Sequence, residues 1–187
     1  YTANCTNGNC DRRAAFLKAV TDLLVADLAE MANDWTAGGA ARTELAAKPA
    51  RDGLGVILTG LGSLSYGELA GERMRLGLIL HDHEEEQDCF SDNTHNSHYF
   101  DQAGMWAIYS GTYTRRGGSR LDGPGLQDLA SEEAPAEAKA LDTRMQDTLA
   151  KMQTMKDRAD SGKEAYDQMI AAGNIEGTAV VQAAIDG

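Results

Sequence analysis

Apolar residues at helical spacing are the feature that most constrains how this chain can fold. From Asp11 to about Trp35 they recur every three or four positions, which is the period of one helical face, and Asp11 can cap the start. The residues of this stripe are Phe16, Val20, Leu23, Leu24, Leu28 and Met31. The same spacing returns from Pro135 to about Arg158, at Leu141, Met145, Leu149 and Met152. Both segments are therefore predicted to be amphipathic helices.

Shorter helices are predicted elsewhere, and strands are not. The shorter helices run from about Tyr99 to Tyr109, from Lys163 to Ala171 and from Thr178 to Ile185. No stretch shows the sustained alternation of apolar and polar residues that marks a half-buried strand. The expected fold class is therefore all-α, a helical bundle.

A second long segment, from about Leu54 to Glu85, is predicted to be helical, either continuous or broken. Seven glycines lie between Gly53 and Gly77, and each costs up to ~1 kcal/mol relative to alanine inside a helix. The stretch from Gln87 to Asn96 is rich in Asp, Asn, Ser and Thr, which favour turns, so we expect an ordered loop there. The glycine-rich stretch from Gly111 to Gly125 is expected to be a long irregular connection, of the kind that often carries function.

Length and charge limit the number of domains and the class of partner. With 187 residues and 42% hydrophobic content, the chain can bury one core, and we predict a single domain over residues 1–187 rather than two small ones. Lys+Arg 17 against Asp+Glu 29 gives a net charge of -12, which repels phosphate backbones and anionic lipid head groups. Nucleic acid is not an expected partner. The charge favours a metal cation or a basic partner, although a merely soluble acidic surface has the same composition.

Neither the apolar content nor the start of the chain predicts a membrane segment. The longest charge-free stretch, Gly53 to Gly67, is shorter than the ~18 to 20 residues that a membrane helix needs. The chain opens at Tyr1 without a methionine or an apolar signal segment, which fits a processed chain and a fragment equally well. Cys5 and Cys10 are spaced to allow a small disulfide loop, which would indicate an oxidising compartment. Cys89 is a metal ligand, a reactive thiol or, more commonly for a lone cysteine, a small buried packing residue.

All four histidines fall in one acidic segment, which makes it the candidate site. The histidines are His81, His83, His95 and His98, and the carboxylates among them are Asp82, Glu84, Glu85, Glu86, Asp88, Asp92 and Asp101. On a helix, His81 would share a face with Glu84 and Glu85, and each pair could grip a metal ion. One such pair supplies only two ligands, whereas a catalytic zinc site uses three protein ligands and an open position. The alternative is a solvated acidic helix end.

Charged residues also interrupt the apolar helix before this segment. These residues are Glu68, Glu72, Arg73 and Arg75. Because an unpaired buried ion is costly, they must pair, bind water or face a ligand. On a helical wheel, Glu68, Arg75, Asp82 and Glu86 lie near one line that leads into the histidines, so they either line a cleft or form an internal lattice of ion pairs.

The loop from Cys89 to His95 offers hydroxyl, amide, carboxylate and imidazole groups on consecutive residues. The same residue types cap helices and turns, so Ser91 and Asp92 are either ligand contacts or caps. Ser91 lacks the Gly-x-Ser-x-Gly surroundings of a hydrolase nucleophile. We expect Glu86, Asp92 and His95 to converge on one polar pocket. Glu68 would join them only if the helix kinks, because a straight helix separates it from Glu86 by about 27 Å.

Several of these motifs resemble the C-terminal repeat of the imelysin-like proteins, insulin-cleaving peptidases or iron-regulated proteins of the bacterial cell envelope. The similar stretches are Leu58 to Ser65, Gly67 to Met74, Glu84 to Glu86, Cys89 to His95, Cys10 to Arg13 running into Leu23 to Leu28, and Gly123 to Leu126. The resemblance implies one half of a duplicated, two-bundle all-α architecture, located in the periplasm or at the outer membrane. It also implies a partner, the N-terminal half of the same family protein, as a separate or cleaved chain.

The resemblance also implies the site residues. The ligand-binding positions are Glu68, Arg73, Ser91, Asp92, Asn93 and Thr94, and the metal-binding positions are Glu84, Glu86 and His95. His81 is a further metal-binding candidate from its spacing to Glu84, and not from the resemblance. The family signature Gly-x-His-x-x-Glu belongs to the other half, and here Ile79 stands where its glycine would precede His81-x-x-Glu84. The peptidase site is therefore not transferred to this chain.

Three functions follow as hypotheses. The first is a cell-envelope protein that binds a ligand linked to iron or another divalent metal, contacted by Glu86, Asp92 and His95 and oriented by Glu68 and Arg73. The second is a metallopeptidase of the imelysin type, with a metal-activated water and a glutamate base. The third is a non-catalytic structural or interaction module.

Overall fold

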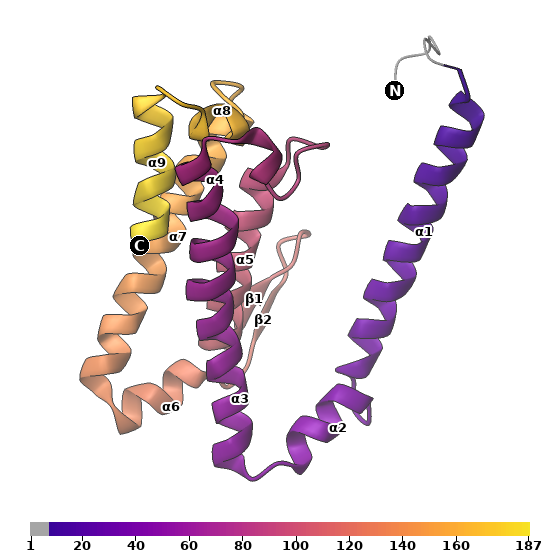
Figure 1. Cartoon of the computed structure of the whole chain (residues 1–187). Coiled ribbons are helices and arrows are strands. Elements are labelled where there is room, and N and C mark those ends of the chain that lie inside the picture. The colour runs from indigo at the N-terminus through magenta and orange to yellow at the C-terminus, as the bar shows by residue number, and fades with distance from the viewer. Residues whose placement is uncertain (1–7) are drawn as a thin grey trace. The chain divides into compact units, whose positions relative to one another are not determined.

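The computed structural model describes residues 8–187, and helices dominate them. A single short hairpin supplies the strands of the described residues, so the predicted all-α fold is confirmed. The helical elements are α1 Cys10–Asp34, α2 Ala40–Ala47, α3 Ala50–Gly62, a π-helix Ser63–Arg75, α4 Leu76–Leu80, a 3₁₀ turn His83–Glu85, α5 Thr94–Ser110, α6 Leu126–Glu133, α7 Pro135–Asp160, α8 Tyr166–Ile170 and α9 Ile175–Asp186. The strands are β1 Thr112–Thr114 and β2 Arg120–Asp122 (Figure 1). The sequence did not predict α2 and α6.

The chain divides into two compact units, the first ending at Leu58 and the second spanning Thr59–Gly187. In the first unit, α1 is the amphipathic helix that the apolar spacing predicts, and none of its side chains is buried. Glycine is required where the chain turns from α1 to α2. A Cβ on Gly39 would lie 2.4 Å from the backbone oxygen of Asn33, closer than any side chain tolerates.

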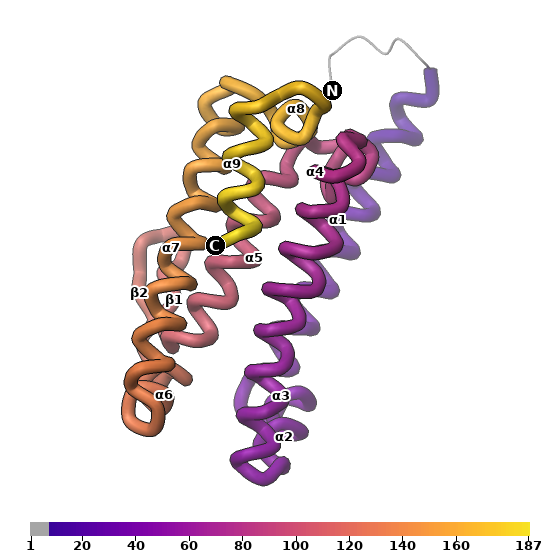
Figure 2. Tube along the Cα trace, turned by 60° about the vertical axis from the view of Figure 1, so that its left-hand side comes forward, coloured from indigo at the N-terminus to yellow at the C-terminus, as the bar shows by residue number. Residues whose placement is uncertain are grey.

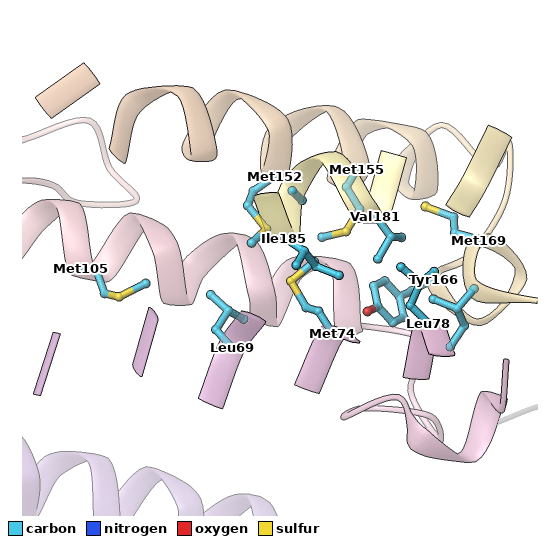
Figure 3. Close-up of a cluster of buried hydrophobic side chains, with 12 residues drawn as sticks. Leu69, Met74, Leu78, Met105, Met152, Met155, Tyr166, Met169, Val181 and Ile185 are labelled. Carbon is cyan, nitrogen blue, oxygen red and sulfur yellow. The ribbon is translucent and has the colours of Figure 1, made fainter. Parts of the chain in front are cut away.

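The second unit contains the hydrophobic core. Helix α5 packs on α7, α7 packs on α9, and α9 packs on the π-helix (Figure 2). Their buried apolar side chains form one cluster: Leu69, Met74, Leu78, Met105, Met152, Met155, Tyr166, Met169, Ile170, Val181, Ala184 and Ile185 (Figure 3). Fully burying each Leu, Met, Val or Ile contributes roughly 1.5–3 kcal/mol. Five of the chain's seven methionines lie in this cluster, where their unbranched side chains fill irregular gaps between the helices.

The predicted long helix changes type at Ser63 instead of breaking. Between Ser63 and Arg75 the chain is a π-helix, whose hydrogen bonds reach five residues along the chain, and α-helical geometry resumes at Leu76. Gly71 fits this wider coil closely, since a Cβ there would lie 3.1 Å from the backbone oxygen of Tyr66, five residues earlier.

The predicted last turn of this helix is wrong. The helix ends at Leu80, because His81 adopts a left-handed conformation with φ of 54° and Asp82 is extended. Residues His83–Glu85 then form a separate 3₁₀ turn, whose start the Asp82 side chain caps. His81 therefore does not share a helical face with Glu84 and Glu85, and helical spacing no longer supports a two-ligand grip. A metal-binding role for His81 and Glu84 stays a prediction.

Helix α5 begins five residues earlier than the sequence suggested, at Thr94 rather than Tyr99. The residues Thr94, His95 and His98 thus lie on the first turns of a helix and not in a loop. Two consecutive backbone hydrogen bonds to the Asn93 carbonyl, from the N–H groups of Asn96 and Ser97, start this helix. The polar composition that suggested a loop is the composition of a helix start.

The predicted irregular connection contains a hairpin. Strands β1 and β2 pair antiparallel, with Thr112 opposite Asp122, Tyr113 opposite Leu121 and Thr114 opposite Arg120. Gly111 ends α5 with φ of 68°, and a Cβ there would lie 2.4 Å from the oxygen of Gly123. The glycines that suggested irregularity allow the two ends of the hairpin to approach each other.

Candidate functional site

Asp88 fixes the loop between the 3₁₀ turn and α5. Its backbone N–H donates to the Thr94 hydroxyl at 3.0 Å, and its carboxylate accepts a short hydrogen bond from the Ser97 hydroxyl. Its carbonyl accepts from the Ser91 hydroxyl at 3.2 Å. These bonds hold the loop against the first turns of α5, where Thr94 and Glu86 become buried.

Glu86 is a buried carboxylate without a full set of partners. It is only 6% exposed, and its Oε2 atom has no hydrogen-bond partner among the described residues. Burial raises the pKa of Glu86, and the negative charges of Asp167, Asp92 and Asp88 raise it further, while the Thr94 hydroxyl acts in the opposite direction. The structure therefore places one poorly solvated carboxyl group amid three other carboxylates.

His98 and Tyr166 extend this buried region from α5 to α8. Their rings meet edge to face with centroids 5.3 Å apart, and neither side chain reaches solvent. Both ring nitrogens of His98 and the Tyr166 hydroxyl have no hydrogen-bond partner among the described residues. Burial lowers the pKa of His98 to about 4, aided by the Arg73 cation, so the ring is neutral at physiological pH.

Tyr166 also lies within electrostatic reach of Glu86. Burial raises the pKa of the Tyr166 hydroxyl, and the Glu86 carboxylate raises it further, which places the two groups in one electrostatic neighbourhood. We call Glu86, Thr94, His98 and Tyr166 the buried polar cluster. An unpartnered buried polar group lowers the stability of the folded state by about 1–3 kcal/mol, so the three such side chains of this cluster destabilise the fold.

His95 points to a different neighbour. Its Nε2 atom lies 3.1 Å from Oδ1 of Asp160 on α7 and 3.0 Å from the Asn96 amide nitrogen, while its Nδ1 atom is buried without a partner. The Lys156 ammonium also bonds Asp160, and together with His95 it lowers the pKa of that carboxyl group. If Nε2 donates to Asp160, Nδ1 keeps a free lone pair, which is the form that binds a metal ion or accepts a hydrogen bond.

Glu68 and Arg73 form an ion pair on the π-helix, with 3.3 Å between Oε2 and a guanidinium nitrogen. The Arg73 cation also lies near α5, where it helps to lower the pKa of His98. Burial raises the pKa of Asp101 on the same helix, and the Arg73 charge opposes that rise. Both side chains of the pair are partly exposed. The sequence allowed either an ion pair or a ligand role for Arg73, and the structure shows the ion pair beside His98.

The remaining predicted residues have structural partners. The Nδ1 atom of His81 donates to the Ile170 carbonyl at 2.8 Å, which ties the end of α4 to α8. The Oε1 atom of Glu84 lies 3.3 Å from the Nε2 atom of His83, the preceding residue in the turn. Asn93 accepts a hydrogen bond from the Asn96 amide at 3.0 Å. The structure thus brings Glu86, Thr94 and Asp92 into one neighbourhood and places His95, Glu68 and His81 against other partners, so binding of a common ligand stays a prediction.

The structure bears on Cys89 but not on the predicted disulfide. Cys5 lies outside the described residues, so the Cys5–Cys10 disulfide stays a prediction. Cys89 is a free thiol, and burial together with Glu84, Glu86 and Asp92 raises its pKa. A thiol with a raised pKa is a poor nucleophile, which fits the packing role more than the reactive one.

The sequence placed His98 in the candidate segment without a role, and it gave no indication of Tyr166. His98 belongs to the histidine group, and its spacing of four from Thr94 and three from His95 would have placed it on the same helical face, had α5 been predicted to start at Thr94. Tyr166 lies 80 residues from Glu86 along the chain, and no local pattern connects the two.

Within residues 8–187, no three His, Cys, Asp or Glu side chains are arranged to hold a metal ion. No helix in the same part of the chain is both long and apolar enough to cross a membrane. The buried polar cluster offers one carboxylate, one neutral imidazole and two hydroxyls, a set that can receive a cation or a group rich in hydrogen-bond donors.

Comparison with known proteins identifies the family. A search of curated proteins found no match. The family model described as imelysin, Peptidase_M75, matches residues 3–187, which is nearly the whole chain. This chain therefore belongs to the imelysin family.

Proposed function

We propose that this imelysin-family chain is a cell-envelope protein that binds a cationic ligand, iron or another divalent metal, at a site built on Glu86. Asp92 and His95 are the further contacts, and Glu68 and Arg73 orient the α5 side of the site. The N-terminal half of the same family protein, as a separate or cleaved chain, supplies the remaining ligands. The observation that carries the proposal is the buried Glu86 carboxyl with an unpartnered oxygen amid three other carboxylates.

The charge around Glu86 favours a cation. Burial removes the water that would otherwise solvate the negative charge of Glu86, and the charges of Asp88, Asp92 and Asp167 disfavour it further. A divalent cation reverses both effects, because it attracts all four carboxylates and replaces the missing hydrogen-bond donor at Oε2. Carboxylate oxygen and imidazole nitrogen are ligands that suit iron and zinc.

The proposal predicts that Glu86 is required for cation binding. We expect the metal-free chain to bind Fe²⁺ or Zn²⁺ in a calorimetric titration, and Glu86→Gln to weaken binding at least about tenfold, since the variant loses the one buried charge. Glu85→Gln is the matched control, because Glu85 is adjacent, exposed and equally charged. Both variants change the net charge by the same amount.

Equal binding by the chain and Glu86→Gln would reject the site. Absence of any binding by the chain alone, followed by binding once the N-terminal half is added, would support the shared site. A proteolysis assay on the metal-loaded chain separates simple binding from the metallopeptidase alternative. If no cation binds under either condition, the chain is a structural or interaction module.

A further inference from the structure

The hairpin between α5 and α6 carries a concentration of positive charge in an acidic chain. Arg115, Arg116 and Arg120 lie within six residues, whereas the net charge of the chain is -12. All three arginines are exposed. Arg120 pairs with Asp122 at 2.6 Å, while Arg115 and Arg116 have no ion-pair partner among the described residues. The tip of the hairpin therefore presents two free guanidinium groups.

The backbone holds this tip in a defined shape. In the loop, the Arg115 N–H donates to the Ser119 carbonyl at 2.9 Å, and the Gly118 N–H donates to the Arg115 carbonyl at 2.8 Å. At the base, the Gly123 N–H donates to the Gly111 carbonyl at 3.0 Å. A Cβ on Gly125 would lie 2.5 Å from the backbone of Ser110, so the end of the hairpin is pressed against the end of α5. The arginines thus project from a braced element and not from a loose loop.

One face of the hairpin is apolar. Tyr113 and Leu121 are directly opposite each other in the register, so their side chains lie on the same face, and they are 56% and 45% exposed. An aromatic ring with a polar tip beside an aliphatic side chain, next to free arginines, is the combination found where proteins meet the head-group layer of a membrane.

We infer that this hairpin docks on an anionic lipid surface. The guanidinium groups of Arg115 and Arg116 donate to lipid phosphates, and Tyr113 and Leu121 enter the head-group layer. A protein partner fits less well, because a stable protein interface covers about 800 Å² on each side and this tip offers only a few side chains. A head-group layer needs no such area, since each basic side chain near it contributes separately.

The acidic remainder of the chain does not prevent this contact. Fields are screened over about 8 Å at physiological ionic strength, so a projecting tip meets the membrane with its own charge. The net negative charge of the rest of the chain makes approach through its acidic parts unfavourable. Binding is consequently weak, reversible and sensitive to salt.

Vesicle co-sedimentation of the full chain tests the inference. We expect binding to vesicles of phosphatidylcholine with phosphatidylglycerol, loss of binding at high salt, and little binding to phosphatidylcholine alone. The double variant Arg115→Ser, Arg116→Ser should bind about 25-fold more weakly, at about fivefold for each arginine. These arginines make no side-chain contact that folding needs, and circular dichroism checks that the helices remain.

A matched control is available on α1. Arg12→Ser, Arg13→Ser removes another adjacent, exposed pair of arginines and changes the net charge equally, and its vesicle binding should equal that of the unaltered chain. Equal loss in both double variants would overturn the inference, as would equal binding to the two kinds of vesicle. Binding to soluble polyglutamate as tight as to the anionic vesicles would assign the hairpin to an acidic protein partner and also overturn it.

Discussion

His98 shows at the residue scale how burial, aided by a nearby cation, sets the protonation state of a side chain. The ring is fully buried against Tyr166, with a pKa of about 4 instead of the usual 6.5, so the folded chain keeps it neutral where the unfolded chain charges it. Between those two pH values the unfolded state binds the extra proton, and the folded state becomes less stable as pH falls. Glu86, whose pKa is raised, contributes in the opposite direction.

The difference between the folded and unfolded pKa of His98 predicts that this residue makes the stability depend on pH. As pH falls from 7 to 5, the His98 contribution should lower the free energy of unfolding by about 2 kcal/mol. In His98→Gln, which cannot titrate, that part of the dependence should vanish, whatever the absolute stability of the variant. Urea unfolding of the metal-free protein at both pH values measures it. His83→Gln, at an exposed histidine, should keep the full dependence, and a loss in both variants would contradict the assignment.

At the scale of elements, the local sequence pattern predicted helices, but it did not predict the π-helix or where α5 begins. The apolar spacing around Leu141 and Met152 placed α7 within two residues of its observed end at Asp160, because a helix of that length is encoded by its own stripe. The π-helix has no such signal, since its glycines are compatible with an α-helix, a break or a wider coil. The start of α5 was missed because Thr94 and Asn96 are equally suited to a loop.

The same limit applies to the candidate site. Glu86 and Thr94 could be selected from the sequence because both lie in the histidine segment. Their burial could not, because it depends on packing between segments far apart in the sequence: α8, which packs on the 3₁₀ turn just before Glu86, starts 80 residues after it. Sequence therefore located the polar groups but not which of them lose contact with water.

Glycines at element contacts give a matched pair of predictions. A Cβ on Gly177 would lie 2.6 Å from the backbone of Met169, where α9 meets α8, so Gly177→Ala should lower the free energy of unfolding by about 1–3 kcal/mol. Gly104 is an exposed position of α5, and a Cβ there would meet nothing within 4 Å, so Gly104→Ala should raise the free energy of unfolding by about 0.5–1 kcal/mol. Denaturant titration of both variants checks the signs. Equal effects would show that α9 does not approach α8 as closely as described.

At the scale of the whole molecule, the two units differ in how much they bury. The core cluster lies entirely within Thr59–Gly187, whereas α1 has no buried side chain. Helices take most of their stability from packing of an apolar face, so the two units should differ in local stability. The single domain predicted for residues 1–187 stays a prediction. One family model covers nearly the whole chain, whereas the chain packs as two compact units, and these two findings define a domain differently.

Hydrogen exchange measures this difference. We expect the backbone amides of α1 to exchange at least about 100-fold faster than those of α7, which packs on both α5 and α9. Mass spectrometry of peptides from the two helices reads both in one experiment. Comparable protection of α1 and α7 would mean that the apolar stripe of α1 is covered in solution.

The packing of α9 on the π-helix also determines when the core can close. Leu69 and Ile185 belong to one buried cluster, yet more than 100 residues separate them along the chain. Individual helices form in about a microsecond, whereas joining such distant segments requires the closure of a long loop before any contact is gained. The slow event in folding of this unit is therefore the arrival of α9, and every earlier state leaves the methionine-lined interior open to water and to other chains.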